Sequence, residues 1–121
     1  MKALIIDDDK RLTDPIAECL VSKGIEVKVA ADSIIGIQIA HKFLPNFILL
    51  DMMLPAGGGT AVLQSLQHSA SLKDIPVIVM TGSQDQTLKK TLLEHGVKTY
   101  LQKPFSLQDL LNAIANLLSP S

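Results

Sequence analysis

Three aspartates, a threonine and a lysine stand where short apolar runs of this 121-residue chain end. The run ALII (3–6) ends in Asp7 and Asp8, FILL (47–50) in Asp51, VIVM (77–80) in Thr81, and TYLQ (99–102) in Lys103. Carboxylate oxygens bind Mg²⁺, and a carboxylate can also accept a phosphoryl group as a nucleophile. These residue types therefore predict phosphoryl transfer to an aspartate with the help of a magnesium ion.

The acidic residues need a neutralising partner if the strands that carry them are neighbours. Their carboxylates would then approach within several Å, and like charges about 4 Å apart repel by roughly 4 kcal/mol at an effective dielectric near 20. Lys103 alone cannot balance this charge. Taken singly, each aspartate can be a helix cap, and the Thr81–Gly82 pair can be a turn. The combination predicts an all-oxygen Mg²⁺ site with room for phosphate oxygens.

Asp51 is the expected phosphoryl acceptor. It follows the apolar run FILL, which predicts a central position in the sheet. The Asp7 and Asp8 pair is placed to hold the metal. Thr81 and Lys103 complete the set around one carboxylate, and phosphoryl transfer depends mainly on positioning and on neutralising the phosphoryl oxygens.

The apolar runs alternate with helix-like segments, which indicates βαβ units and a parallel sheet. Alternation in IEVKVA predicts an edge strand with one wet face, whereas FILL and VIVM predict strands covered on both faces. Ligands bind beyond the carboxyl ends of such strands, which is where the polar residues fall. Five strands are expected, at KALIID (2–7), IEVKVA (25–30), NFILLD (46–51), PVIVM (76–80) and TYLQK (99–103).

Two helices can be predicted with some detail. Ser106 and Asp109 fit a capping box ahead of an amphipathic helix. The isoleucine-rich segment 32–40 suits a strand or a helix, and the crossover that parallel strands require decides for a helix. Its isoleucines predict either a wide buried face or one residue that faces a partner.

Pro15 leaves two alternatives for the first helix. If the helix starts after Asp9, Pro15 removes an internal hydrogen bond and kinks it. If it starts late, Asp14 is its cap and Pro15 its first residue.

Composition excludes several classes of function. The net charge is −1 with no run of Lys or Arg, so neither nucleic acid nor an anionic membrane is an expected partner. The single cysteine cannot form an internal disulfide. No leader and no apolar stretch of about 18 residues is seen, which predicts a cytoplasmic protein. A strand from residue 2 suits a natural amino terminus, while SPS (119–121) is either a true end or the start of a linker.

The chain resembles the receiver domains of response regulators in two-component signalling. The resemblance rests on LIIDDDK, LLDMMLPAGGG, VIVMTG and TYLQKPFS, which follow the family's order and spacing over nearly the whole chain. It implies one receiver domain over residues 1–121. The implied fold is α/β: a doubly wound (βα)5 flavodoxin-like three-layer sandwich around a five-stranded parallel sheet of order 2-1-3-4-5. That order would make the first and third strands neighbours.

The resemblance also implies a metal site and a phosphoacceptor. Asp51 would accept the phosphoryl group and bind the metal. Asp8 would be a direct Mg²⁺ ligand, Asp7 a ligand through water, and the backbone carbonyl of Met53 a further ligand. The resemblance also implies that Mn²⁺ can replace Mg²⁺ in such a site.

A second group of residues would respond to the phosphoryl group. By the same resemblance Thr81 hydrogen-bonds a phosphoryl oxygen, Lys103 pairs with the phosphoryl group, and the Lys103–Pro104 peptide bond is cis. Tyr100 matches the family's aromatic switch and would turn inward, although a plain packing role is the alternative. The surface that changes would be the fourth helix, fifth strand and fifth helix, roughly residues 84–118.

The implied partners are proteins. A histidine kinase or a histidine phosphotransfer protein would supply the phosphoryl group, and a downstream protein or a fused output domain would receive the signal. A phosphorylation-linked homodimer through the switching surface is also implied. The domain itself would not be an enzyme beyond its own phosphorylation and dephosphorylation.

Departures from the family pattern cluster near the acceptor. Gly57 and Gly58 replace bulkier residues, which predicts a mobile loop after Asp51. Met53 and Ser83 occupy two variable positions that tune dephosphorylation in this family. An apolar Met53 cannot orient an attacking water, so a long-lived phosphoryl group is predicted.

Two rival functions remain at this level. A haloacid-dehalogenase-type phosphatase also opens with Asp-x-Asp after a strand and continues with a strand that ends in Thr. However, the only acid after Lys103 is Asp109, within the last helix, and Asp51 would have no role. The other rival is a degenerate receiver that binds partners without phosphate.

Overall fold

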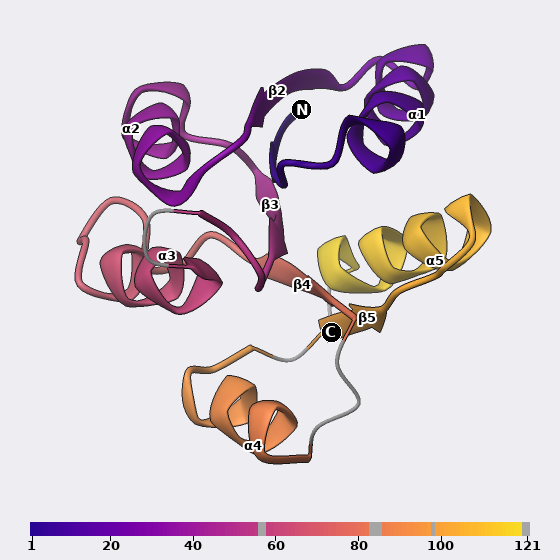
Figure 1. Ribbon diagram of the computed structural model, residues 1–121. Coiled ribbons are helices and arrows are strands. Elements are labelled where there is room, and N and C mark those ends of the chain that lie inside the picture. The colour runs from indigo at the N-terminus through magenta and orange to yellow at the C-terminus, as the bar shows by residue number, and fades with distance from the viewer. Residues whose placement is uncertain (56–57, 83–85, 98, 120–121) are drawn as a thin grey trace.

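Five strands alternate with five helices in the part of the chain that the computed structural model describes, residues 1–55, 58–82, 86–97 and 99–119 (Figure 1). The strands are β1 (Lys2–Ile6), β2 (Glu26–Ala30), β3 (Phe47–Asp51), β4 (Val77–Thr81) and β5 (Thr99–Gln102). The helices are α1 (Lys10–Ser22), α2 (Ser33–Phe43), α3 (Gly58–Gln67), α4 (Gln86–Glu94) and α5 (Leu107–Leu118).

The strands form one parallel sheet in the order β2-β1-β3-β4-β5. This confirms the predicted fold class and strand order. Strand β1 lies directly beside β3, with Ile6 opposite Leu50. The residues that follow these two strands are therefore delivered to adjacent points on the carboxyl edge of the sheet.

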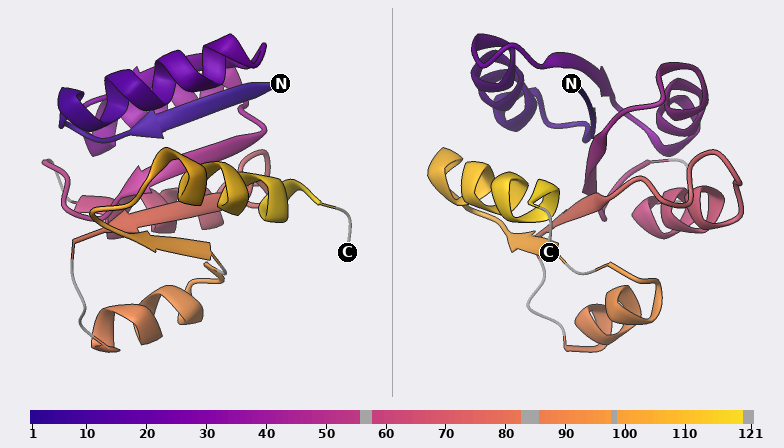
Figure 2. Two further views of the ribbon diagram at one scale, coloured as in Figure 1. Left: turned by 90° about the vertical axis from the view of Figure 1, so that its right-hand side faces the viewer. Right: turned by 180° about the vertical axis from the view of Figure 1, so that it is seen from behind.

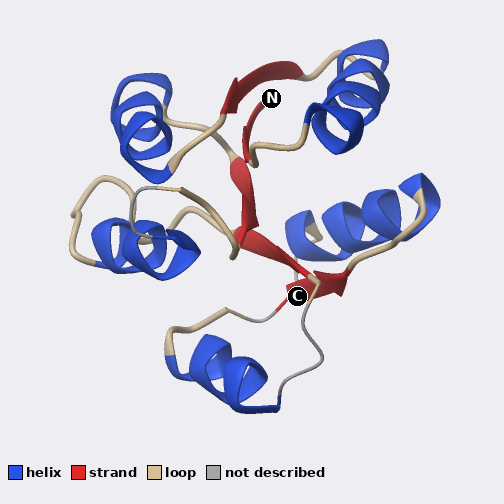
Figure 3. Cartoon of the chain, viewed as in Figure 1, coloured by secondary structure: helices blue, strands red, loops and turns tan. Residues whose placement is uncertain are grey.

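Helices cover both faces of the sheet, as the views from several sides show (Figures 1–3). Helices α1 and α5 pack on one face, and α2, α3 and α4 pack on the other. Every residue of β3 is buried, whereas β2 at the edge is mostly exposed. This confirms the prediction of a central strand that is buried on both faces and an edge strand that is partly exposed to solvent.

Helix α1 begins at Lys10 and runs through Pro15, so the late start with Asp14 as cap is wrong. The cap is Asp9, whose carboxylate accepts a hydrogen bond from the amide of Arg11. The amide of Thr13 donates a 3.0 Å hydrogen bond to the carbonyl of Asp9, as expected for a helix that starts directly after Asp9. Pro15 lies on the exposed side of the helix, where water can replace the hydrogen bond that proline cannot make.

Segment 32–40 forms the start of α2, which confirms the helix. Its isoleucines divide between two environments. Ile37 and Ile39 pack against the core, whereas Ile34 and Ile35 are 58% and 45% exposed. The buried face of α2 is thus narrower than its composition predicts.

The predicted capping box of α5 is present, with both Ser106–Asp109 hydrogen bonds in place. Within the described ranges, no helix is long and apolar enough to cross a membrane. Gly57 and Ser83, on which two of the expectations above depend, lie outside the described residues.

Candidate phosphoryl-transfer site

The carboxyl ends of β1 and β3 bring Asp7, Asp8 and Asp51 together. One carboxylate oxygen from each lies within 4.8 Å of the others. Asp7 and Asp51 are 2% and 4% exposed, whereas Asp8 is open to solvent. Two buried carboxylates and one exposed carboxylate therefore share a single point on the rim of the sheet.

Lys103 reaches this cluster from the loop after β5. Its Nζ atom lies 3.0 Å from Oδ2 of Asp7 and 3.6 Å from Oδ1 of Asp51. The amide of Lys103 donates a 2.7 Å hydrogen bond to the carbonyl of Thr81, which fastens the loop to the end of β4. The Lys103–Pro104 peptide bond is cis, in agreement with the expectation from sequence.

The pKa of Asp7 is raised above its ordinary value of 3.8. Removal from water is the largest cause, and the negative charge of Asp51 adds to it. The amide of Asp9, 2.9 Å from Oδ1 of Asp7, and the ammonium of Lys103 act in the opposite direction but do not outweigh burial. The folded protein therefore disfavours the ionised form of Asp7.

The donor set fits a magnesium ion. It consists of oxygen atoms, which Mg²⁺ prefers, and exposed Asp8 leaves one side of the cluster open to water and phosphate. Three carboxylates and one ammonium carry −3 + 1 = −2 when all are ionised. A divalent cation would neutralise that charge.

Backbone hydrogen bonds hold the described residues that follow Asp51. The amide of Met53 donates to Oδ1 of Asp51 at 3.1 Å, and the amide of Gly59 donates to the carbonyl of Met52 at 3.1 Å. A Cβ on Gly59 would lie 2.8 Å from the carbonyl oxygen of Asp51, so only glycine fits there. The side chain of Met53 is 77% exposed.

Thr81 and Tyr100 occupy different surroundings. Thr81 is the last residue of β4 and is 2% exposed, on the same rim as the carboxylates. Tyr100 on β5 has 39% of its surface exposed, and Nζ of Lys89 lies 5.6 Å from the centre of its ring. Tyr100 is thus not a core residue in this structure.

Sequence reasoning missed Ser33 and the backbone amides of Asp9 and Met53. Every residue except proline has a backbone N–H group, so residue types do not reveal which amides donate to the site. Ser33 follows Asp32, and such a pair before a helical segment indicates only a helix cap. In the structure Asp32 is the cap, and the hydroxyl of Ser33 points instead to the loop after Asp51.

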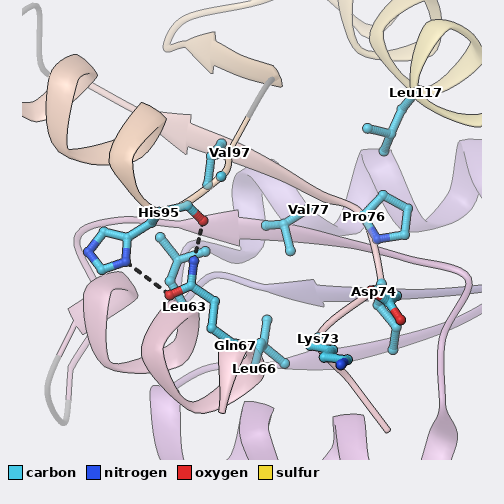
Figure 4. Close-up of a pocket in the computed structure, with 12 residues that line it drawn as sticks. Leu63, Leu66, Gln67, Lys73, Asp74, Pro76, Val77, His95, Val97 and Leu117 are labelled. Carbon is cyan, nitrogen blue, oxygen red and sulfur yellow. Dashed lines mark hydrogen bonds between the residues drawn. The ribbon is translucent and has the colours of Figure 1, made fainter. Parts of the chain in front are cut away.

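A separate cavity of about 350 Å³ lies near the start of β4, between the last turns of α3 and α4 (Figure 4). Gln67 joins the two helices there: its amide donates to the carbonyl of His95, and its oxygen lies 3.1 Å from Nδ1 of the same residue. None of the predicted site residues lines this cavity. It lies at the amino end of the sheet, away from the carboxylates.

The model of the response regulator receiver domain family matches residues 3–115, and the chain belongs to this family. The phosphatase alternative is therefore wrong. The described structure agrees, since Asp109 is engaged in capping α5.

Among curated proteins, the chain is 35% identical over 117 residues to the DNA-binding dual master transcriptional regulator RpaA of Synechocystis, covering 97% of this chain and 48% of that protein. It is 32% identical over 116 residues to hybrid signal transduction histidine kinase D of Dictyostelium discoideum, covering 96% of this chain and 7% of that protein. The chain thus spans at most about half the length of these relatives.

Solved structures agree on the fold. The chemotaxis response regulator CheY4 of Vibrio cholerae has a TM-score of 0.90 at 25% identity, over 97% of this chain and 98% of that chain. The receiver domain of Francisella response regulator 1452 has a TM-score of 0.85 at 28% identity, over 96% and 94%.

Proposed function

We propose that residues 1–121 act as one receiver domain that accepts a phosphoryl group on Asp51 with the help of Mg²⁺. The observation that supports this proposal is a cluster of three carboxylates, two of which lie close to the ammonium group of one lysine. Nζ of Lys103 lies 3.0 Å from Asp7 and 3.6 Å from Asp51, and the carboxylate oxygens of Asp7, Asp8 and Asp51 lie within 4.8 Å of one another.

The reaction is an in-line transfer. A carboxylate oxygen of Asp51 forms a bond to phosphorus while the bond from phosphorus to a histidine nitrogen of the donor breaks. The donor imidazole leaves with the electron pair of that bond. With acetyl phosphate, the bond that breaks is phosphorus–oxygen and acetate leaves.

The chain's own residues position and neutralise the phosphoryl group. Asp7, Asp8, Asp51 and the carbonyl of Met53 would hold Mg²⁺, or Mn²⁺ in its place. The metal supplies positive charge for the phosphoryl oxygens. Lys103 then turns from Asp7 toward the phosphoryl group, and the amide of Met53 and the hydroxyl of Thr81 donate hydrogen bonds to its oxygens.

Signalling follows from the new charge. Thr81 moves toward the phosphoryl group, Tyr100 turns inward from its exposed position, and the surface of α4, β5 and α5 changes. We propose a histidine kinase or a histidine phosphotransfer protein as donor. The changed surface would contact a downstream protein, a fused output domain or a second copy of the chain.

Other properties follow from this role. The domain would be no enzyme beyond its own phosphorylation and dephosphorylation, and it would act in the cytoplasm. The net charge of −1 without a basic run supports a domain that itself binds neither nucleic acid nor membrane.

Phosphorylation by acetyl phosphate tests the proposal. The protein is incubated with acetyl phosphate in the presence and absence of Mg²⁺, and covalent phosphate is measured by intact mass. We expect one phosphate on the unaltered chain only with Mg²⁺, none on Asp51→Asn, and one on the control Asp14→Asn, which alters an exposed carboxylate in α1. Phosphate on Asp51→Asn would refute the acceptor, and no phosphate on any form would favour a degenerate receiver.

A further inference from the structure

Ser33 is the first residue of α2 and is 1% exposed, yet its side chain does not cap its own helix. Asp32 fills that role by accepting a hydrogen bond from the amide of Ile35 at 2.8 Å. The hydroxyl of Ser33 donates across to the β3–α3 loop instead. It lies 2.8 Å from the carbonyl oxygen of Gly58 and 3.2 Å from that of Pro55.

The backbone of Ser33 adds a further bond to the same loop. Its amide lies 3.4 Å from the carbonyl oxygen of Pro55. One serine thus contacts the carbonyls of Pro55 and Gly58, which lie on either side of the two loop residues outside the described ranges. The hydroxyl has a single proton, so it favours the shorter bond to Gly58 and shares it with Pro55.

This loop is the one that begins at the proposed phosphoacceptor. Its start is held by the Met53 amide on Asp51, and its end by the Gly59 amide on Met52. Between these two points, Leu54 is buried in the core. From α2, the hydroxyl of Ser33 contacts the carbonyls of Pro55 and Gly58, which follow Leu54 in the chain.

We propose that Ser33 is a positioning residue for phosphoryl transfer. By holding the carbonyls of Pro55 and Gly58, it keeps the amide and the carbonyl of Met53 in place beside Asp51. The inference rests on the proposed function. Ser33 can have this role only if the carbonyl of Met53 binds the metal and its amide donates to the phosphoryl group.

The physical cause is preorganisation. Without the hydroxyl, the backbone around Met53 samples more conformations. Metal binding must then offset the conformational entropy lost when this backbone becomes ordered, so the affinity for the metal falls. Groups that orient metal ligands without touching the metal typically change affinity by about 10-fold to 100-fold when removed. The expected effect is therefore on Mg²⁺ affinity more than on folding.

The experiment compares four forms of the protein. Ser33→Ala removes the hydroxyl, and Ser33→Thr retains it. Ile114→Val is the matched control, because it trims the core beneath α5 on the other face of the sheet. Mg²⁺ affinity is measured by calorimetry with the metal alone, phosphorylation by acetyl phosphate, and loop order in metal-free protein by amide exchange at Met53 and Gly59. Urea unfolding gives the stability of each form.

We expect Ser33→Ala to bind Mg²⁺ about tenfold more weakly, with faster exchange at Met53 and Gly59. Ser33→Thr should recover most of the affinity, and Ile114→Val should lose stability without a change in affinity. Equal Mg²⁺ affinity in the unaltered protein and Ser33→Ala would overturn the role of Ser33 and leave the proposed function intact. No Mg²⁺ binding by the unaltered protein would overturn both.

Discussion

The ammonium group of Lys103 lies 3.0 Å from a carboxylate oxygen of Asp7, although β3 and β4 separate the strands that these residues follow. The same ammonium lies 3.6 Å from Asp51. Lys103 therefore supplies, in the metal-free protein, positive charge at the place where Mg²⁺ is proposed to bind. If Mg²⁺ binds there as proposed, Lys103 would compete with the metal for the carboxylates until a phosphoryl group gives the lysine another partner.

Replacement of Lys103 should separate metal binding from phosphoryl transfer. We expect Lys103→Met to bind Mg²⁺ at least as tightly as the unaltered protein, because a competing cation is gone. Phosphorylation by acetyl phosphate should slow by about 100-fold, the typical cost of one lost group that stabilises developing charge. Calorimetry and a phosphorylation time course measure the two effects, with Lys42→Met, an exposed lysine of α2, as control. Weaker Mg²⁺ binding by Lys103→Met would contradict the competition.

Replacement of Asp7 should stabilise the metal-free protein. Because the pKa of Asp7 is raised in the folded state, the folded protein holds this proton more tightly than the unfolded chain does. The free energy of unfolding therefore falls as the pH rises from about 3.8 through the raised pKa, and above that pKa the ionised carboxylate destabilises the folded protein. Asp7→Asn removes that cost, so its Tm without metal should be higher by a few degrees.

The same variant should lose its response to magnesium. A ligand present at about 100 times its Kd stabilises the folded state by about 2.7 kcal/mol. Mg²⁺ should therefore raise the Tm of the unaltered protein and of Asp14→Asn, but not that of Asp7→Asn. Thermal unfolding with and without Mg²⁺ measures this, and a full Mg²⁺ response in Asp7→Asn would show that Asp7 does not serve the metal.

The sheet and its polar rim could be predicted because the relevant signals are local. Each apolar run is short, each ends in a polar residue, and parallel strands deliver their carboxyl ends to one edge. Asp7, Asp51 and Lys103 are thus placed on that edge by the order of elements alone. The neighbouring positions of β1 and β3 came from family resemblance, since strand order has no local signature.

The contacts that tune the site could not be predicted because they are tertiary. The hydroxyl of Ser33 meets carbonyls 22 and 25 residues further along the chain. Lys103 reaches Asp7 across 96 residues. The two alternatives that Pro15 left open could not be decided from the sequence, because a proline is costly inside a helix but tolerated on its exposed side, and exposure depends on packing.

Lys89 should favour the exposed position of Tyr100. A cation over an aromatic ring at an exposed site contributes about 0.5–1 kcal/mol, or roughly a twofold to fivefold change in a two-state population. Tyr100 is the only tyrosine and the chain has no tryptophan, so its fluorescence reports on this residue alone. We expect acrylamide to quench Tyr100 less in Lys89→Ala than in the unaltered protein or in the control Lys90→Ala.

Phosphorylation should protect Tyr100 in the same assay. Acetyl phosphate with Mg²⁺ should lower the quenching of the unaltered protein, because Tyr100 is proposed to turn inward, and should leave Asp51→Asn unchanged. Identical quenching before and after phosphorylation would argue against Tyr100 as the switch.

Met53 should give the phosphoryl group a long lifetime. Its side chain is 77% exposed next to the acceptor and carries no group that could orient an attacking water. We expect phosphate on Asp51 to persist for minutes or longer after the donor is removed. Met53→Glu adds a carboxylate that can position water, and this should shorten the half-life by roughly tenfold. The control Leu93→Glu also replaces an exposed apolar residue by glutamate, at a 61% exposed position in α4, and should leave the half-life unaltered. Release of inorganic phosphate follows the decay, and a half-life of seconds in the unaltered protein would show that something other than residue 53 controls it.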